Sequence, residues 1–272
     1  MTEVGIITSD HIRHRYLVRE IQKDFPVTCL VVEAKPPISL SLRETVGPIV
    51  GEHFRERNEV EEKYFGSLGD FDAQNRLVKK MNWGEVNSGE TFEWVTGRSP
   101  DLIVLFGSSI VKEPLLSQYE GRMINMHLGL SPYYRGSGTN FWPLVDGYPE
   151  CVGVTIHHAA LKVDAGNIIA QGRPDTEEGD GCHDLGCKSV MEGAGLLLRI
   201  LAEFGRGPFP GLPQTGGGRL CRRKDFTVDA LIKMKKNFAN GMVQEYLKEK
   251  RSRDQAFPIV GLQGLTGVVR AR

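Results

Sequence analysis

The 272-residue sequence has no excess of charge of either sign: Lys and Arg together number 34, and so do Asp and Glu. A net charge of zero gives no long-range field that would gather nucleic acid around the protein. We therefore expect no nucleic-acid partner, although a local basic patch could still bind phosphate.

Long apolar runs are also missing, and nowhere do about 18 apolar residues follow one another. The N-terminus, MTEVGIITSD, lacks the basic segment and apolar stretch of a secretion signal. The five cysteines are an odd number and widely scattered, which is typical of free thiols. We expect a cytoplasmic protein with no membrane partner. Cys182 and Cys187 enclose a histidine but lack C-x-x-C spacing, so no metal site is expected.

A hydrophobic content of 40% and a charged content of 25% are ordinary for a globular protein. Residues 4–8, 27–32 and 102–106 are continuously apolar, as in parallel strands that are buried on both faces. Helical patterns separate them, beginning with 11–24. The sequence therefore predicts an α/β fold, a doubly wound and mostly parallel sheet with helices on both faces, followed by a short C-terminal helical extension.

The chain divides into three predicted parts. Residues 1–204 form the catalytic domain, and within it 35–80, rich in proline at first and then strongly charged, is expected to be a surface helical insertion. Residues 205–218 are dense in Gly and Pro and are predicted to be a linker. Residues 219–272 form the helical extension, with a basic amphipathic helix over 229–250.

Three polar residues are predicted to converge at the open end of the sheet. Asn125 and His127 lie two apart on a strand, so their side chains point the same way, and Asp164 follows in a later turn. An amide, an imidazole and a carboxylate suit acyl transfer to an amine, because the reaction needs a proton acceptor and a donor to the developing oxyanion. We expect Asp164 to raise the pKa of His127 by charge pairing. No nucleophilic serine or cysteine is evident, so direct transfer without an acyl-enzyme is expected.

The segments INMHLGLSPYYRG and GVTIHHAALKVDAGNII together resemble the folate-dependent formyltransferases. This group contains methionyl-tRNA formyltransferase, glycinamide ribonucleotide transformylase and the sugar N-formyltransferases. The resemblance is good over 102–169, and it implies that Asn125, His127 and Asp164 are catalytic and that 10-formyltetrahydrofolate is the donor. It also implies a folate pocket lined by Leu105, Phe106, Gly107, Ile110, Val163 and Gly166.

The acceptor amine is less defined. The turn after the first strand reads TSDHIRHRYL, in which His11, Arg13, His14 and Arg15 could meet phosphates or a carboxylate at a helix N-terminus. Arg135 and Gly136 either close a loop or bind substrate. The loop after His127 departs from the family, because it carries Gly129 and Ser131 where Ser and Leu are frequent. Too few residues follow 218 for the C-terminal barrel domain of the transfer RNA enzymes. We expect a nucleotide-linked or similar amino sugar.

Several alternatives stay open. A formyltetrahydrofolate hydrolase, a glycinamide ribonucleotide-type transformylase and a non-catalytic folate- or nucleotide-binding module all fit the same motifs. A homodimer is neither favoured nor excluded. His157 and His158 are neighbours on a strand, face opposite sides, and are interpreted as structural.

Overall fold

The computed structural model describes residues 1–35, 48–72, 74–205 and 207–262. Its main sheet has seven strands in the order β3-β2-β1-β4-β5-β7-β8. The strands from β3 to β5 pair in parallel, and β7 runs antiparallel to both of its neighbours. Their bounds are β1 Val4–Ser9, β2 Val27–Ala34, β3 Val78–Asn82, β4 Leu102–Phe106, β5 Met123–Leu128, β7 Val154–His158 and β8 Ile168–Gly172. The predicted fold class, a mostly parallel α/β sheet, is confirmed.

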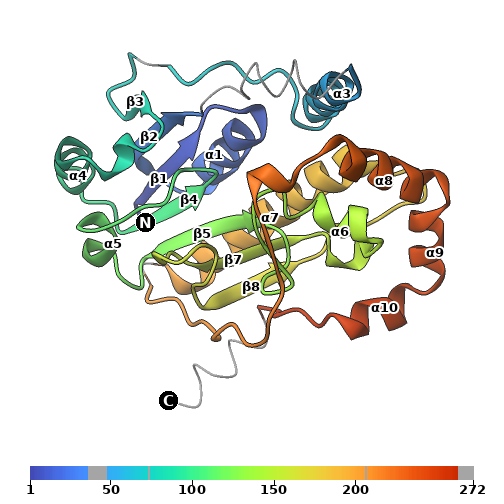
Figure 1. Ribbon diagram of the computed structural model, residues 1–272. Helices are drawn as coiled ribbons and strands as arrows, with labels where there is room; N and C mark the ends of the chain where they lie inside the picture. The colour runs from blue at the N-terminus through green and yellow to red at the C-terminus, as the bar shows by residue number, and fades with distance from the viewer. Residues whose placement is uncertain (36–47, 73, 206, 263–272) are drawn as a thin grey trace.

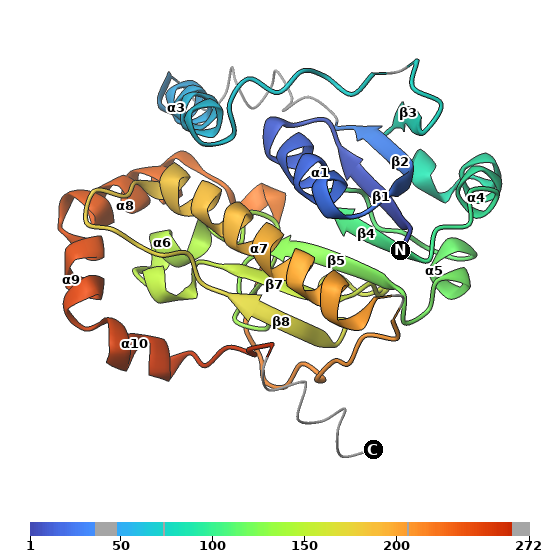
Figure 2. The ribbon, with the colours of Figure 1, turned by 180° about the vertical axis from the view of Figure 1, so that it is seen from behind.

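Helices cover both faces of this sheet. Helices α1, Ile12–Asp24, and α7, Cys182–Phe204, lie on one face and are in front in Figure 2. Helices α4, Gly89–Thr96, and α5, Leu115–Gln118, lie with the opposite face (Figure 1). The strands β1 and β4 are buried along their whole length because both of their faces are covered.

The stretch 35–80, expected to be a surface helical insertion, divides differently in the structure. Helix α3, Pro48–Phe65, contacts α1 and α7 and buries Val50 and Phe65, so it is more than a surface element. Residues 78–80 then begin β3, which pairs with β2 at the sheet edge. The sequence analysis did not predict this strand, because an edge strand needs backbone partners on one side and few apolar residues. Residues 36–47 lie outside the described residues.

The C-terminal part packs onto the main domain through its own group of buried apolar side chains. Leu231, Met234 and Met242 join Trp142 and Leu144 in this group. The expected single helix over 229–250 is interrupted at Gly241, whose φ of 81° is left-handed. The elements here are α6 Trp142–Asp146, α8 Val228–Ala239, α9 Met242–Lys248 and α10 Lys250–Ala256, with short 3-10 helices at Pro149–Cys151 and Arg223–Asp225 and another at Glu85–Asn87 in the main domain.

The segment 205–218, predicted as a linker, runs alongside the sheet edge in the residues that are described. Leu212 forms an antiparallel bridge with Ile168 of β8, and Phe209 is buried in the main core. After it, β9, Arg219–Cys221, pairs with β6, Tyr134–Gly136, in a separate two-stranded sheet. None of the described helices is long and apolar enough to cross a membrane.

Candidate active site

Asn125 and His127 project from β5 on the face of the sheet opposite α7. Ile124 and Met126, which alternate with them, pack into the core beneath α7. Asn125 is paired with Leu105 in β4 on one side and with His157 in β7 on the other. Since β4 ends one residue after Leu105, the two polar side chains lie where that strand gives way to a loop.

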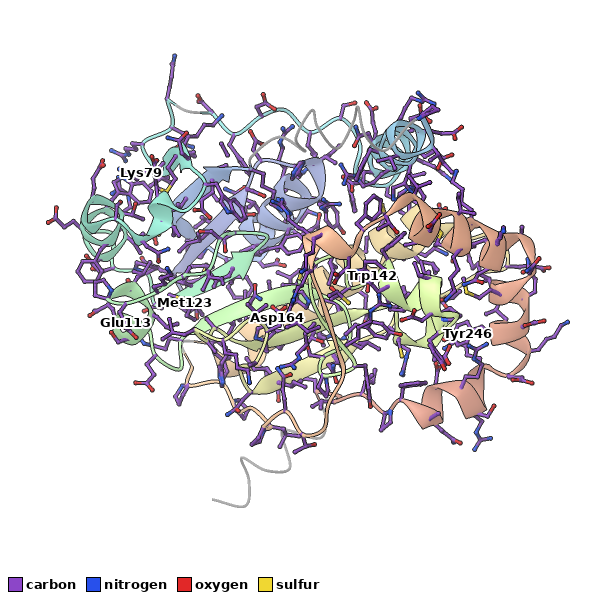
Figure 3. The ribbon with its side chains drawn as sticks, viewed as in Figure 1. Lys79, Glu113, Met123, Trp142, Asp164 and Tyr246 are labelled. Carbon is purple, nitrogen blue, oxygen red and sulfur yellow. The ribbon has the colours of Figure 1, made fainter. Side chains whose placement is uncertain are left out.

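Asp164 reaches the same place from the turn between β7 and β8. Its Oδ1 lies 3.4 Å from Nδ1 of His127 and 3.8 Å from Nε2 of His157. In Figure 3 the labelled Asp164 lies over the middle of the sheet, between Met123 and Trp142. The three side chains that the sequence singles out therefore meet. We refer to Asn125, His127, His157 and Asp164 as the catalytic cluster, after the role predicted for three of them.

The backbone holds Asp164 in a conformation that is unusual for a residue with a side chain, with a φ of 46°. Gly136 donates its backbone N–H to Oδ2 of Asp164 over 2.8 Å. Gln214 donates from Nε2 to the carbonyl oxygens of Asp164 and Gly166, over 2.7 and 2.8 Å. A side chain on Gly166 would collide with the carbonyl oxygen of His158, so this turn requires glycine. Gly136, predicted to bind substrate, here anchors Asp164.

His157 is a member of the cluster that sequence reasoning missed. Its Nδ1 lies 2.8 Å from the carbonyl oxygen of His158 and its Nε2 lies 3.1 Å from Nδ2 of Asn125. A carbonyl can only accept, so Nδ1 carries the proton and Nε2 accepts from the amide. The amide nitrogen of Asn125 is thereby turned toward His157, and its second N–H is left for another acceptor. Only the register of β5 against β7 reveals this pairing.

Thr139 fixes the tautomer of His127. The threonine hydroxyl donates to the carbonyl oxygen of Leu128 and lies 3.1 Å from Nε2 of His127. Because its proton is used, the hydroxyl oxygen accepts from Nε2–H of the imidazole. The other ring nitrogen, Nδ1, faces the carboxylate of Asp164 and is the position at which a proton would be gained.

Both cluster histidines are neutral near neutral pH. Burial lowers the pKa of His127 below its ordinary value, although the charge of Asp164 opposes the shift. Burial, and next the charge of His127, lower the pKa of His157 to about 4. The expectation that Asp164 would raise the pKa of His127 was wrong in its net direction. The carboxylate acts as predicted, but the loss of hydration outweighs it.

The residues predicted to contact folate fall into two groups. Leu105 and Phe106 are buried strand residues, and Phe106 packs edge-on to the ring of His14 with centroids 4.6 Å apart. Ile110 and Val163 expose 45% and 40% of their surface, which leaves apolar side chains available on the loops after β4 and β7. Gly107 has a φ of 70° and, like Gly166, shapes the backbone.

Glu33 supports the loop after β4. This fully buried carboxylate accepts from the backbone N–H and the hydroxyl of Ser109, over 2.6 and 2.8 Å, and from the N–H of Gly84, over 2.7 Å. It thus ties the end of β2 to the loop that begins at Gly107. The isolated acid in an apolar strand was a signal that sequence reasoning did not use.

The turn after β1 carries the residues predicted to bind an acceptor. His14 is 2% exposed and its Nδ1 lies 2.7 Å from the Ser9 hydroxyl. Arg13 pairs with Glu61 of α3, whereas Arg15 pairs with Asp10 and Asp70, each at 2.6 Å. Arg15 is therefore committed to holding the loop, and a substrate role for these residues stays a prediction.

Lys35 joins this region from the end of β2. Burial, and next the charge of Arg13, lower its pKa to about 7. Burial and the same arginine lower the pKa of His11 to about 3, with Lys35 contributing. We call His11, Arg13, His14 and Lys35 the N-terminal basic cluster. Elsewhere, Nε of Arg135 is buried and has no hydrogen-bond partner among the described residues.

The sheet topology and the polar cluster over β5 together define a Rossmann-like α/β protein with a site suited to group transfer. The formyl transferase family model matches residues 70–200, which contain every member of the catalytic cluster. Over these residues the chain is similar to the formyltransferase family.

One curated protein is similar to part of this chain in sequence, and two solved structures are similar to it in fold. The methionyl-tRNA formyltransferase of Staphylococcus aureus strain JH1 is 34% identical over 132 residues, which are 48% of this chain and 42% of that protein. The chain thus matches less than half the length of such curated relatives. A sugar N-formyltransferase from a Shewanella species is 18% identical with a TM-score of 0.55, covering 83% of this chain and 78% of its own. The phosphoribosylglycinamide formyltransferase of Anaplasma phagocytophilum is 16% identical with a TM-score of 0.51, covering 82% and 98%. The two solved structures share the fold.

Proposed function

We propose that the protein is an N-formyltransferase that moves the formyl group of 10-formyltetrahydrofolate to the amine of a small acceptor. The observation that carries this proposal is the meeting of Asn125, His127 and Asp164 around one point, inside the part of the chain that matches the formyltransferases. The fold alone would not support it, because one fold hosts many activities.

In the proposed reaction the acceptor amine attacks the formyl carbon directly. The new C–N bond forms as the old bond from that carbon to the donor nitrogen breaks. Negative charge that develops on the formyl oxygen is stabilised by the N–H of Asn125 that is not used by His157. His157 is thus a positioning residue, since it acts through Asn125.

The proton lost by the amine passes to the pair formed by His127 and Asp164 and then to the leaving nitrogen. Nδ1 of His127 is unprotonated at neutral pH and faces Oδ1 of Asp164, so a proton between the two is held by both. The cluster therefore needs no covalent intermediate. No cysteine or serine nucleophile belongs to it.

The donor pocket is proposed on the loops after β4 and β7. Ile110 and Val163 present exposed apolar surface there, which suits the flat ring of a pterin. Gly107 and Gly166 let these two loops lie close to His14 and to the His158 carbonyl, respectively, where a side chain would collide. Glu33 holds the first of these loops in place.

For the acceptor we propose an amine that carries phosphate, such as a nucleotide-linked amino sugar. The N-terminal basic cluster supports this, because Lys35 and His11 lie close to other cations and would gain from a bound anion. Aminoacyl-tRNA is the second candidate, because the curated relative named above is a methionyl-tRNA formyltransferase. Acceptors of the two kinds can be compared directly.

The test is release of tetrahydrofolate from 10-formyltetrahydrofolate in the presence of a panel of amino sugars, glycinamide ribonucleotide and charged transfer RNA. We expect release only with an acceptor. Asn125→Ala should lower kcat/KM by about 10²–10³, as for loss of an oxyanion donor. Asn58→Ala, a change at an exposed position of α3, is the matched control and should leave activity unchanged. Full activity of Asn125→Ala, or formate release without any amine, would contradict the proposal.

A further inference from the structure

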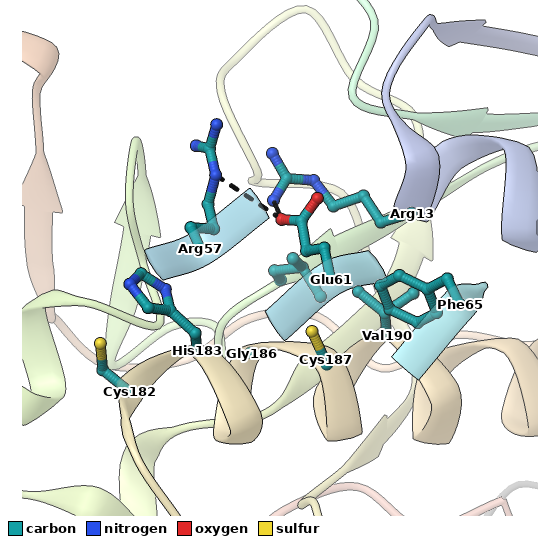
Figure 4. Close-up of a pocket in the computed structure, with 10 residues that line it drawn as sticks. Arg13, Arg57, Glu61, Phe65, Cys182, His183, Gly186, Cys187 and Val190 are labelled. Atoms are coloured by element: carbon teal, nitrogen blue, oxygen red, sulfur yellow. Dashed lines mark hydrogen bonds and ion pairs between the residues drawn. The ribbon is translucent and has the colours of Figure 1, made fainter. Parts of the chain in front are cut away.

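Three potential metal ligands meet where α3 crosses the first turn of α7. His53 comes from α3, and Cys182 and His183 begin α7. One ligand atom from each lies within 4.8 Å of the others. Figure 4 shows Cys182 and His183 at the start of α7, at one end of a small cavity whose far side is formed by Arg57 and Glu61 of α3. None of the catalytic cluster lines this cavity.

Each of the two imidazoles has a nitrogen atom without a hydrogen-bond partner in the described chain. His53 is 7% exposed, and its Nδ1 is buried without a hydrogen-bond partner. Nε2 of His183 is likewise buried and unpartnered. Buried polar atoms in native proteins almost always have partners, so two such nitrogens beside one thiol call for an explanation.

Packing explains the positions of these rings but not their nitrogens. The rings of His53 and His183 lie 4.5 Å apart, and Phe226 and Phe141 each lie 6.1 Å from His53. These ring contacts do not involve the ring nitrogens. Imidazole nitrogens cost free energy at this position unless something binds them.

The unpartnered ring nitrogens suit a cation. Nδ1 of His53 and Nε2 of His183 are buried and donate to no described acceptor, so each is placed to offer a lone pair. The ring of His183 also hydrogen-bonds the backbone of His53. Because Nε2 is unpartnered, this bond uses Nδ1, which is the usual way in which a metal-binding histidine is oriented.

The surrounding charges nearly cancel. Arg57 and Lys235 face the three ligands, and so do the carboxylates of Glu56 and Asp184. Lys235 lies 3.4 Å from Glu56, which offsets its charge. A dication that binds one thiolate would add a single positive charge to this setting.

We propose that His53, Cys182 and His183 form a binding site for a transition-metal ion of the zinc type, which joins α3 to the N-terminus of α7. Two imidazoles and one thiolate are donors that Zn²⁺ and its neighbours prefer over Mg²⁺ or Ca²⁺. Metal–ligand bonds of about 2.0–2.3 Å place tetrahedral donors roughly 3.3–3.8 Å apart, so side-chain movements of about 1 Å close the site. Three protein ligands leave a fourth position for water.

Binding exchanges one proton for the metal ion. The Cys182 thiol, whose pKa burial raises to about 12, loses its proton to solvent as the sulfur–metal bond forms. No electrons are transferred.

The test is titration of the protein, freed of metal by a chelator, with Co²⁺ and then Zn²⁺. A thiolate-to-cobalt charge-transfer absorption should appear at one equivalent and disappear as Zn²⁺ displaces Co²⁺. Cys182→Ser should remove this absorption and weaken Zn²⁺ binding about 100-fold or more, since even loss of an outer partner costs roughly 10–100-fold. Cys187→Ser is the matched control: this cysteine lies on the same helix and lines the same cavity but is not one of the three ligands.

The readout does not depend on formyl transfer, so the two proposals fail separately. His183→Gln gives a second variant should Cys182→Ser fold poorly, and it should lose affinity while keeping the thiolate band weakly. Absence of a cobalt–thiolate absorption in the unchanged protein, or its persistence in Cys182→Ser, would overturn the site.

Discussion

The catalytic cluster and the N-terminal basic cluster differ in how their polar groups are satisfied. In the first, each side chain has a neutral or opposite partner: His157 for Asn125, Thr139 for His127, and the Gly136 backbone for Asp164. In the second, Lys35 and His11 lie among further cations, and repulsion adds to the effect of burial on their pKa values. The catalytic cluster is complete as it stands, whereas the basic cluster would be stabilised by an anion.

Under the proposed function, this difference separates the residues that take part in the reaction from those that bind the acceptor. Groups that must hold one geometry are interlocked by hydrogen bonds, which keeps them in place before substrate arrives. Groups that must accept a charged ligand are left electrostatically unbalanced, and the ligand supplies the missing charge. Changes in the first region should therefore alter turnover, and changes in the second should alter acceptor binding.

The largest effect is expected for Asp164→Asn. The amide keeps the hydrogen bond from the Gly136 backbone but removes the charge that holds a proton with His127. We expect kcat to fall by about 10²–10⁴, with little change in KM, as for loss of a group in proton transfer. Steady-state kinetics at saturating donor measures this. Asp175→Asn, an exposed change, is the control; an unaltered kcat in Asp164→Asn would remove the carboxylate from the reaction.

A smaller effect, on binding alone, is expected for Lys35→Met. Loss of the ammonium group should raise the acceptor KM by about ten-fold, in keeping with a charge-assisted hydrogen bond, and leave kcat nearly unchanged. Because the pKa of Lys35 is near 7, the acceptor KM of the unchanged protein should also rise as pH increases beyond that value. Lys112→Met, at an exposed position, should do neither. A fall in kcat without a change in KM would place Lys35 with the chemistry instead.

The smallest effect is expected on the free energy of unfolding, and it concerns the histidines of both clusters and of the rest of the protein. All seven histidines have a pKa below the ordinary value of 6.5, chiefly through burial. Below pH 6.5 the unfolded chain takes up protons that the folded protein does not, so the free energy of unfolding should fall as pH decreases. Each fully buried histidine contributes at most ~1.4 kcal/mol per pH unit.

Urea unfolding between pH 7.5 and 5 tests this slope. Protonation of paired carboxylates acts in the same direction at lower pH, so the comparison with His14→Asn isolates one histidine. That variant should be less stable at pH 7.5 and show a shallower slope. Equal slopes for the two proteins would mean that His14 takes up protons equally in the folded and unfolded states, so that burial does not lower its pKa.

Much of the site could be predicted from local sequence, but its cross-strand and long-range parts could not. Asn125 and His127 share a strand face by simple alternation, and the resemblance pointed to Asp164. His157 escaped because its role depends on pairing with Asn125, and that register appears only when β7 is known to run antiparallel beside β5. The net direction of the pKa shift of His127 could not be predicted for a related reason, since the burial of a side chain does not follow from the residues next to it in the sequence.

The same distinction applies to the fold. Strands β1, β2 and β4 are continuous apolar runs, and all could be recognised. Strand β3 could not, because VKKMN carries the polarity of an exposed edge. The break at Gly241 divides a pattern that is uniformly helical in sequence.

The hydrogen bonds from Gln214 to the Asp164 turn limit how this protein can be shortened to a functional fragment. All of the proposed catalytic side chains precede residue 200, but the amide that grips both ends of the Asp164 turn belongs to a segment that follows α7. A fragment that stops with the family match would carry every reactive group and lack the support for one of them. The segment that contains Gln214 therefore supports the proposed active site, and shortening this segment should loosen the Asp164 turn without changing Asp164 itself.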